Sequence, residues 1–517
     1  MSLVSFSFAI FLICSLVSYY IIPRKFQWII LLAASTFFYF CAGVGNFAFI
    51  IFSSLTTFFA ARLAAKFNHQ LAEKKQVLSK EDFKVEKQRS QQKKRIVLSI
   101  LLTLNVGILI FLKYINALFI HKTLLLPLGI SYYTLQLIAY FMDVYNSKCQ
   151  AENNFLRFYS FISFFPQLIM GPINRYPQLG KQMKEEHSFD FSNMKHGVML
   201  ILYGAMKKYV IADLLYQRVV AVLDNSPLNI PGILIVFGVL MYAVYQYADF
   251  SGGIDMVLGI AELFGLKMQE NFKQPYFSTS LANFWQRWHI SLGSWMRDYV
   301  FYPFAFTKFM QNLSKWCASH LGKHFAKVLP AGIANILVFM LVGLWHGPEI
   351  HFFVWGLYNG IVIALSDFLS PAFNRLNEIL HINAKSRGMH IFRIVRTFII
   401  VNIGWYFDHI VDIKRAFIYL KNTFLHFGPV STLINRQYLI QIFGHISNFE
   451  SQIVLVIIGS AIVFAVSLLK ENKVDVYAKI QKKNIVLRWM SYYVLMALII
   501  LSFSFTSGET GFMYAQY

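Results

Sequence analysis

Long runs of apolar residues recur along the chain and alternate with shorter polar segments. A transmembrane helix needs about 20 mostly apolar residues, and many of these runs approach that length. The pattern predicts an all-α polytopic membrane protein, with about 11 or 12 transmembrane helices in a single membrane domain. The domain covers residues 1–517, and its predicted spans are residues 3–22, 28–42, 47–65, 96–119, 126–145, 198–222, 231–262, 331–347, 351–370, 397–411, 452–469 and 489–506.

Two stretches between these spans, residues 146–180 and 263–305, combine aromatic and apolar residues with proline, arginine, aspartate and asparagine. They are too polar to face lipid and too apolar to be free loops. Irregular polar backbone at membrane depth persists only where protein buries it or water lines it. We therefore expect re-entrant or interfacial helices packed inside a ring of spans.

Lysine and arginine are concentrated in the segments between alternate spans. If the N-terminus lies outside, the inner segments hold 37 of the 47 basic residues and the outer segments hold 5. Cytoplasmic segments of membrane proteins carry such an excess. The first span lacks a basic leader and a small-residue cleavage site, so we expect it to be retained. The sequence thus predicts a multi-pass protein of the cell membrane with both termini on the extracytoplasmic side.

Composition excludes several classes of protein. Charged residues form 14% of the chain, against about 25% in soluble domains, and the mean hydropathy is +0.51. Both values argue against an ordinary soluble enzyme. The net charge of +22 would suggest nucleic acid in a soluble protein, but basic residues between spans instead orient the chain in the bilayer, so we expect no nucleic-acid partner.

The most basic inner segment, residues 66–95, has a net charge of +6. It is predicted as a cytoplasmic loop whose solvated helix fixes orientation and contacts anionic lipid. A docking site for a cytosolic carrier is the alternative. The four cysteines lack zinc-type spacing, and no H-E-x-x-H motif occurs, so we expect neither a metal site nor a disulfide framework. Sequence motifs of serine hydrolases, P-loop ATPases and dinucleotide-binding enzymes are also missing.

The densest group of candidate functional residues lies in residues 271–303. A helix through this stretch would place Trp285, Trp288 and His289 on one face, because side chains three and four residues apart are neighbours. The Arg297–Asp298 pair could anchor the helix to an adjacent element. An interfacial helix with a tryptophan and arginine belt is the competing interpretation.

A second candidate is His346, which ends an apolar run and is followed directly by Gly347 and Pro348. An ionisable side chain at the end of a span usually faces the protein interior or a watery cavity. Glycine and proline should end the helix there and let a ligand approach the imidazole. A histidine that only packs and forms hydrogen bonds between helices is the alternative interpretation.

A third stretch places Asp249, Ser251 and Asp255 inside an apolar run. We interpret it as a kinked helix whose carboxylates pair with arginines such as Arg287 or Arg297, since buried charges need partners. A fourth stretch, residues 164–175, contains two prolines and a glycine. It is predicted to turn at or within the membrane.

Together these stretches resemble the membrane-bound O-acyltransferase family, in particular its bacterial polysaccharide branch of the alginate O-acetylation type. The core that carries the resemblance is residues 127–360. Its matching motifs are PLGISYYT at 127–134, FFPQ at 164–167, GPI at 171–173, DFSG at 249–252, ENF at 270–272, PY at 275–276, FWQRWHIS at 284–291, RD at 297–298 and WHG at 345–347, and residues 511–517 resemble the family's aromatic ending.

The resemblance implies a ring of helices around a central tunnel, and acyl transfer from a cytoplasmic thioester to a hydroxyl group. It maps the catalytic histidine onto His346, as general base, and the second family histidine onto His289. Histidine suits this role because its ordinary pKa is about 6.5. The residues expected to line the tunnel or support it are Trp345, Trp285, Trp288, Arg287, Asp249, Ser251, Asn271, Arg297 and Asp298.

The resemblance also implies the partners. No cofactor is expected to be bound permanently, and the acyl donor is expected to be acetyl-CoA or an acyl carrier protein on the cytoplasmic side. The acceptor is expected to be an extracytoplasmic polysaccharide or a partner acyltransferase. The chain departs from the alginate pattern at residues 302–307, where YPFAFT replaces a Pro-Leu-Gly-Gly turn. D-alanyl transfer to teichoic acid, or a non-catalytic transporter or scaffold, are the alternatives.

Overall fold

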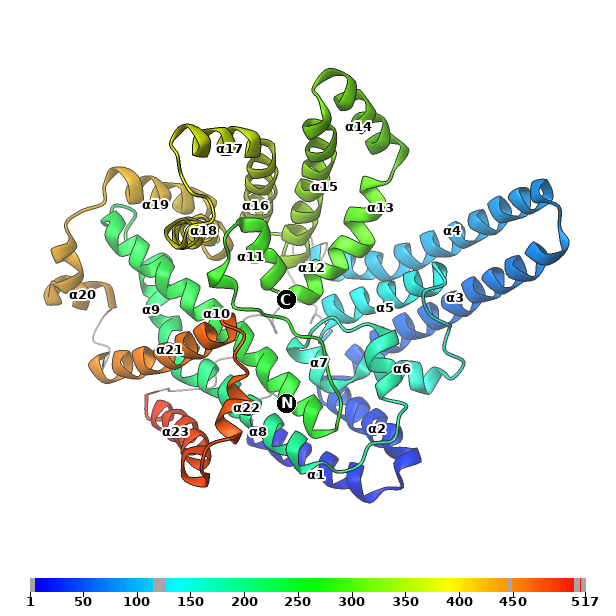
Figure 1. The fold of residues 1–517 in the computed structure, drawn as a ribbon. Helices are drawn as coiled ribbons and strands as arrows, with labels where there is room; N and C mark the ends of the chain where they lie inside the picture. Colours follow the sequence, from blue (N-terminus) through cyan, green and yellow to red (C-terminus); the bar gives the residue numbers. More distant parts are fainter. Residues whose placement is uncertain (1–4, 115–126, 444–448, 506–511, 513–517) are drawn as a thin grey trace. The chain divides into compact units, whose positions relative to one another are not determined.

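A computed structural model describes residues 5–114, 127–443, 449–505 and Phe512, and Figure 1 shows that the described residues form helices. Their only strand-like pairing is one isolated antiparallel bridge between Phe272 and Trp288. The all-helical class is therefore confirmed. Parts of the predicted span 96–119 and all of the 511–517 motif except Phe512 lie outside the described residues, as do the two ends of the chain.

The chain divides into two compact units. The first unit takes in residues 1–198 and 257–269, and the second takes in residues 199–256 and 270–513. Helices α8 (Phe191–Met206) and α10 (Gly232–Leu263) each contribute to both. The other helices of the first unit are α1 Phe6–Ile21, α2 Gln27–Phe40, α3 Val44–Val77, α4 Lys80–Ile110, α5 Ile130–Tyr145, α6 Phe155–Ser163 and α7 Phe165–Met170.

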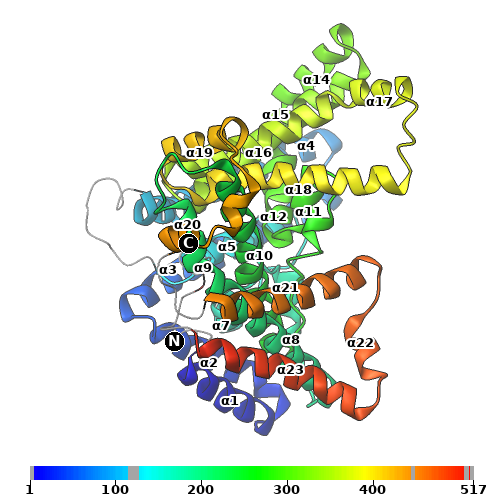
Figure 2. The same ribbon diagram turned by 90° about the vertical axis from the view of Figure 1, so that its left-hand side faces the viewer.

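The second unit holds the remaining helices. In Figure 2, α22 links the ends of α21 and α23. The bounds are α9 Asp213–Leu223, α11 Leu281–Arg287, α12 Ile290–Met296, α13 Tyr302–Ala305, α14 Lys308–His320, α15 Lys323–His346, α16 Ile350–Phe368, α17 Ser370–Ile379, α18 Arg387–His409, α19 Ile413–Leu425, α20 Arg436–Phe443, α21 Phe449–Glu471, α22 Val476–Gln481 and α23 Ile485–Phe503.

Seven helices in the described part of the chain are long and apolar enough to cross a bilayer, which confirms a polytopic membrane protein. They are Gly45–Val77, Lys80–Tyr114, Gly232–Leu263, Lys323–His346, Ile350–Phe368, Ser451–Glu471 and Ile485–Phe503. The other predicted spans fall mostly on shorter helices, such as the 16 residues of α1 and the 14 of α2. Span 198–222 is interrupted by a π-helical turn, Lys207–Ala212. The larger number of crossings and the tunnel remain predictions.

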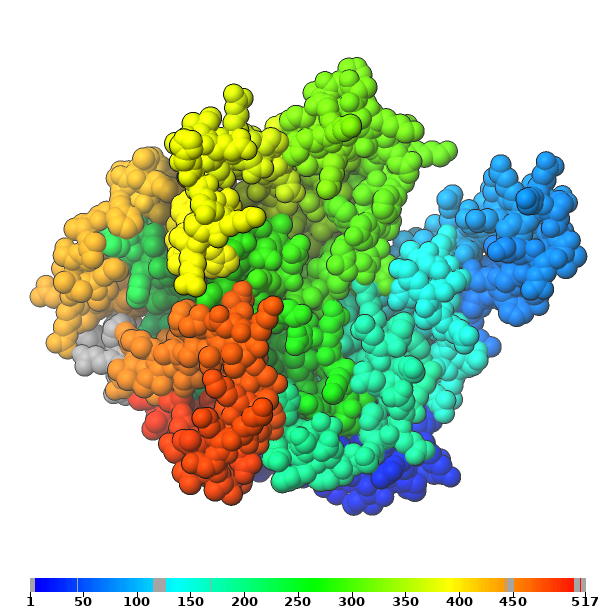
Figure 3. Space-filling model, viewed as in Figure 1, coloured from blue at the N-terminus to red at the C-terminus, as the bar shows by residue number. Residues whose placement is uncertain are grey.

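The basic segment 66–95 is not a loop. It forms the ends of α3 and α4, which join at Leu78 and Ser79, and in Figure 3 the tip of this hairpin is a separate blue projection. The Ser79 hydroxyl caps α4 by accepting the Asp82 N–H, and the base of the hairpin is fixed by Lys94, whose Nζ lies 2.8 Å from Asn68 Oδ1. The predicted solvated helix is thus a helical hairpin.

Helices α15 and α16 pack with their backbones almost in contact. A Cβ atom on Gly343 would lie 2.3 Å from the Phe352 carbonyl oxygen, and one on Gly356 would lie 2.3 Å from the Phe339 carbonyl oxygen. Small residues allow such close approach between membrane helices. The glycines therefore hold the end of α15, with His346, against the first turns of α16.

Candidate active site

His346 is the last residue of α15, and its side chain is buried with 5% of the residue exposed. Gly347 is extended and α16 begins three residues later, at Ile350. The predicted end of the helix after this histidine is confirmed. A Cβ on Gly347 would lie 2.7 Å from the Phe352 ring. Any larger residue would therefore disturb the aromatic contacts of the imidazole.

Three aromatic rings surround the His346 imidazole. The Phe352 ring stacks on it with a centroid separation of 5.7 Å, and the Trp355 ring meets it at 84° with a separation of 5.4 Å. The preceding Trp345 ring lies 5.1 Å away. Two of these rings belong to α16, so the close α15–α16 packing forms this environment.

His289 lies in a break between two short helices, so the predicted continuous helix is wrong. α11 ends at Arg287, Trp288 is extended, and His289 itself has a left-handed backbone with φ of +47°. The chain breaks because the Arg287 carbonyl accepts the Lys273 N–H at 2.9 Å, and the Ile290 N–H donates to the Asn271 carbonyl at 3.1 Å. These bonds replace helical ones.

The break also separates the two tryptophans that were expected on one face. Trp285 lies in α11, whereas Trp288 pairs with Phe272 through the isolated bridge. Both still join one aromatic cluster, because each contacts the ring of Trp405. Helical periodicity predicted that the two tryptophans are neighbours on one helix. They are instead brought into one cluster by the break in the backbone.

Asn271 determines which nitrogen of His289 carries a proton. The Asn271 Oδ1 atom accepts the Ser291 backbone N–H at 3.0 Å, which identifies this side-chain atom as the acceptor oxygen. The same oxygen lies 3.3 Å from His289 Nδ1. The Nδ1 atom therefore donates to it, and Nε2 carries the lone pair. Burial lowers the pKa of His289 to about 3, so the ring is neutral at physiological pH.

The structure brings the two predicted histidines into one cluster within the second unit. The Trp345 ring contacts both, at 5.1 Å from the His346 ring and 6.4 Å from the His289 ring. The Phe250 ring also contacts His289, at 4.9 Å. The sequence separation of 57 residues hides this proximity, which arises from the α11–α12 break and the end of α15.

Two further residues of the cluster were not predicted from the sequence. Trp355 contacts both His346 and Trp285, and Asn359 Oδ1 accepts the Trp285 indole N–H at 3.0 Å. Both lie on the apolar helix α16. The available signal was their spacing of four residues in a span that directly follows the His346 motif.

Several polar atoms of this cluster are buried without a hydrogen-bond partner among the described residues. They include Asn271 Nδ2, Ser291 Oγ and Trp355 Nε1. Buried polar groups are nearly always hydrogen-bonded in folded proteins, and exceptions call for an explanation such as a ligand or water. The cluster therefore has donors available to a bound molecule.

The carboxylates of α10 pair with lysines and not with the arginines that we expected. Asp249 lies 2.8 Å from Lys208 Nζ, and Lys207 contacts Asp255 and donates to Ser251 Oγ at 3.0 Å. Both lysines belong to the π-helical turn Lys207–Ala212, and α10 continues through the stretch as one helix. A π-turn adds a residue to the helical repeat, which apolar periodicity does not reveal.

The two arginines have other partners. Arg287 NH1 lies 2.7 Å from Glu471 Oε2 at the end of α21, and Arg297 Nε lies 3.1 Å from its neighbour Asp298. Arg287 therefore ties the histidine-bearing segment to a helix far along the chain. Among the described residues, no group of three histidine, cysteine or acidic side chains is placed to hold a metal ion.

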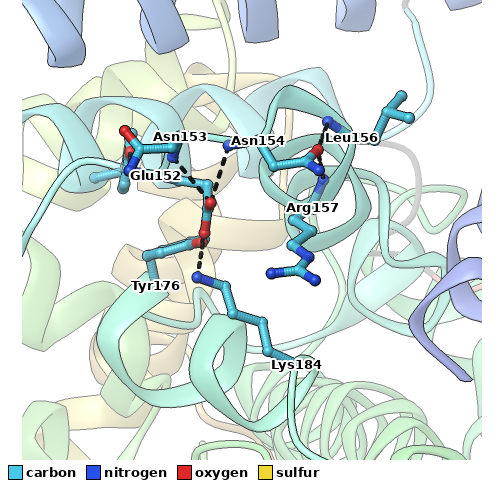
Figure 4. Close-up of polar contacts among 8 residues, drawn as sticks. Glu152, Asn153, Asn154, Leu156, Arg157, Tyr176 and Lys184 are labelled. Carbon is cyan, nitrogen blue, oxygen red and sulfur yellow. Dashed lines mark hydrogen bonds and ion pairs between the residues drawn. The ribbon is translucent and has the colours of Figure 1, made fainter. Parts of the chain in front are cut away.

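A second polar cluster, in the first unit, is centred on Glu152 (Figure 4). Its carboxylate accepts the Tyr176 hydroxyl at 2.6 Å and the Asn154 backbone N–H at 3.0 Å, and it pairs with Lys184. Burial raises the pKa of Glu152, but hydrogen bonds from Lys184, Tyr176 and Asn154 outweigh burial and lower the pKa to about 2. This cluster fixes the chain ahead of α6.

Comparison with known proteins identifies relatives of this chain. The family model described as MBOAT, membrane-bound O-acyltransferase family, matches residues 152–314. The match includes Asn271 and His289 and ends before His346.

The chain is 34% identical over 293 residues to a probable alginate O-acetylase AlgI of Pseudomonas syringae, covering 56% of this chain and 49% of that protein. It is 31% identical over 365 residues to a peptidoglycan O-acetyltransferase of Helicobacter pylori, covering 63% and 64%. It is 30% identical over 285 residues to a teichoic acid D-alanyltransferase of Bacillus subtilis, covering 54% and 67%. The aligned region thus spans about half the length of the alginate relative.

Proposed function

Because the chain belongs to the membrane-bound O-acyltransferase family, we propose that it transfers an acyl group from a thioester donor to a hydroxyl group of a cell-envelope polysaccharide. The single observation that supports this most directly is the pairing of His346 and His289 around Trp345 in one buried cluster. The relatives named for alginate and peptidoglycan O-acetylation favour acetyl as the group transferred.

In the proposed reaction, His346 is the general base. The acceptor oxygen attacks the thioester carbonyl carbon, a C–O bond forms, and the hydroxyl proton passes to the imidazole. The carbonyl electron pair moves to oxygen and then returns as the C–S bond breaks. The proton leaves the imidazolium for the departing thiolate. A positioned general base of this kind contributes about 10²–10⁴-fold to the rate.

His289 has a different proposed role. Its buried ring stays neutral, and Asn271 holds the proton on Nδ1, so Nε2 is a hydrogen-bond acceptor. An acceptor in this position orients a second hydroxyl group of the acceptor sugar without itself becoming charged. The aromatic rings around both histidines exclude water, which limits hydrolysis of the thioester.

We further propose that the donor is acetyl-CoA or a carrier-bound acyl group that enters from the cytoplasm. The excess of basic residues in the predicted inner segments attracts such anionic donors. The acceptor is an extracytoplasmic polysaccharide or a partner acyltransferase. A second candidate is D-alanyl transfer from a carrier protein, which is favoured by the similarity to the teichoic acid D-alanyltransferase.

The test uses the full-length protein in inside-out membrane vesicles supplied with labelled acetyl-CoA. Wild-type protein should transfer label to polysaccharide or to a partner protein, and His346→Ala should slow transfer about 10²–10⁴-fold. The matched control is His351→Asn. His351 is also buried, five residues away, but its Nδ1 is bound to the Phe407 carbonyl at 2.9 Å, so this variant should keep its activity.

Other outcomes separate the alternatives. An unchanged rate in His346→Ala would overturn the catalytic role of this residue. Transfer from a D-alanyl carrier, with no response to acetyl-CoA, would identify the second candidate. Wild-type protein that consumes neither thioester, yet moves polymer or recruits an acyltransferase, would be a transporter or a scaffold.

A further inference from the structure

Trp355 lies on α16, nine residues after His346, and only 2% of the residue is exposed. Its ring contacts the His346 ring edge-to-face, with centroids 5.4 Å apart. It also contacts the Trp285 ring, with the ring centroids 5.3 Å apart and the ring planes at 89°. This indole therefore lies against the proposed base, inside the aromatic cluster.

The indole N–H groups of Trp285 and Trp355 differ in whether they have a hydrogen-bond acceptor. The Trp285 N–H donates to Asn359 Oδ1 at 3.0 Å, whereas the Trp355 N–H is buried and has no acceptor among the described residues. An indole nitrogen can only donate. A buried donor without an acceptor destabilises the fold, so its position beside a histidine calls for a ligand that accepts.

We infer that the Trp355 indole N–H donates a hydrogen bond to the thioester carbonyl oxygen while that oxygen gains negative charge. The inference rests on the proposed function, because it assigns the group that stabilises the oxyanion in the same acyl transfer. As the hydroxyl oxygen attacks the carbonyl carbon and its proton moves to His346, the electron pair that shifts to the carbonyl oxygen meets this donor. When the C–S bond breaks, the electron pair returns to the carbonyl and the hydrogen bond from Trp355 weakens.

The Trp355 ring is in direct contact with the His346 ring, so the donor and the base can act on one substrate group. An oxyanion donor lies about 3 Å from the carbonyl oxygen, and a general base lies about 3 Å from the hydroxyl that it deprotonates. A base and a donor acting on the same tetrahedral centre are thus roughly 5–6 Å apart. The centroids of the His346 and Trp355 rings are 5.4 Å apart, so the two residues border one small region of the cluster.

The other two unpartnered groups belong to the His289 side of the cluster. Ser291 donates its backbone N–H to Asn271, and the Asn271 oxygen lies beside His289 Nδ1. Their side-chain atoms are therefore placed with the residue proposed to orient the acceptor sugar. Trp355 combines burial, an N–H without an acceptor among the described residues and contact with the proposed base.

The experiment replaces only the N–H group. Trp355→Phe and Trp355→β-(3-benzothienyl)alanine, in which sulfur replaces the indole N–H, are compared with wild-type protein in the vesicle assay with labelled acetyl-CoA. The sulfur analogue keeps the size and shape of the ring, so it tests the donor even where phenylalanine impairs folding. The matched control is Trp316→Phe, on the exposed surface of α14, which should leave kcat and KM unchanged.

Both Trp355 variants should lower kcat about 10²–10³-fold, the loss found when one oxyanion donor is removed, while KM for the donor changes less than about 3-fold. The pH dependence of kcat should keep its shape, because His346 is intact. A sulfur analogue with wild-type kcat would overturn the inference and leave the proposed function standing. Wild-type protein that transfers no acyl group would overturn both.

Discussion

The Glu152 cluster and the histidine cluster are both buried and polar, but they differ in how fully their groups are paired. Around Glu152, the carboxylate meets a hydroxyl, backbone N–H groups and an ammonium. Around His346 and His289, Asn271 Nδ2, Ser291 Oγ and Trp355 Nε1 have no partner among the described residues. A fully satisfied network stabilises one conformation, whereas an incomplete one is completed by a ligand. The first cluster is thus typical of a structural site and the second of an active site.

The strongest test of the structural half of this comparison is Glu152→Ala. It should lower the free energy of unfolding by about 2–4 kcal/mol, because it leaves several buried donors without an acceptor. Thermal unfolding in detergent measures the effect. Glu186→Ala, an exposed change two residues after Lys184, should stay within about 0.5 kcal/mol of wild type. Equal stability of the two variants would contradict the structural role.

The functional role of the histidine cluster is tested by Asn271→Leu. Without the acceptor oxygen, the proton of His289 is no longer held on Nδ1. We therefore expect kcat to fall about 10²-fold, equivalent to about 2.7 kcal/mol of transition-state stabilisation. Asn271→Asp retains an acceptor oxygen and should restore part of the rate. Its negative charge favours the imidazolium form, so the pH profile should move as well. Full activity in the leucine variant would show that the tautomer of His289 does not matter.

The geometry shared by His346 and Trp355 is tested through Gly356→Ala on α16. The added Cβ would lie 2.3 Å from the Phe339 carbonyl oxygen, so α15 and α16 must move apart. We expect a loss of about 1–3 kcal/mol in stability and a lower kcat. Gly388→Ala in α18, where a Cβ would meet no atom within 4 Å, should be neutral or slightly stabilising. Similar effects in both variants would count against the close packing.

The smallest expected effect is the dependence of protein stability on pH, which differs between the two clusters. His289 has a pKa of about 3 in the folded protein and about 6.5 when unfolded, so its contribution to stability is present above pH 6.5 and is lost as pH falls toward 3. Glu152, lowered from 4.5 to about 2, behaves in the same direction but only below about pH 4.5.

Between pH 8 and 5.5, stability should therefore fall by about 1.4 kcal/mol through His289 alone. Unfolding of wild type and His289→Gln across this range measures the difference. The variant should lack most of this slope. An identical slope in both proteins would mean that another group titrates there.

The sequence predicted the class of fold and the end of the helix at His346, because apolar length and a Gly-Pro pair act locally. It did not predict the break at Trp288 and His289. That break depends on hydrogen bonds with residues 271–273, which lie about four to five helical turns earlier in the chain. Helical periodicity contains no information about such pairing.

The partners of the buried carboxylates were also missed. Arginine was a reasonable expectation for Asp249, but the nearest cations, Lys207 and Lys208, belong to a π-turn whose extra residue changes which side chains face α10. Trp355 was missed because a tryptophan in an apolar span has an ordinary explanation in packing. Only its unpartnered N–H and its contact with His346 distinguish it.

The glycine contacts between α15 and α16 restrict how this site can evolve. Since the two backbones already touch, no substitution at Gly343 or Gly356 can bring the helices nearer, and every larger residue pushes them apart. The distance between the imidazole and the indole is therefore at its lower bound. Enlarging either glycine would move the indole away from the imidazole, whereas any closer approach must come from other walls of the site.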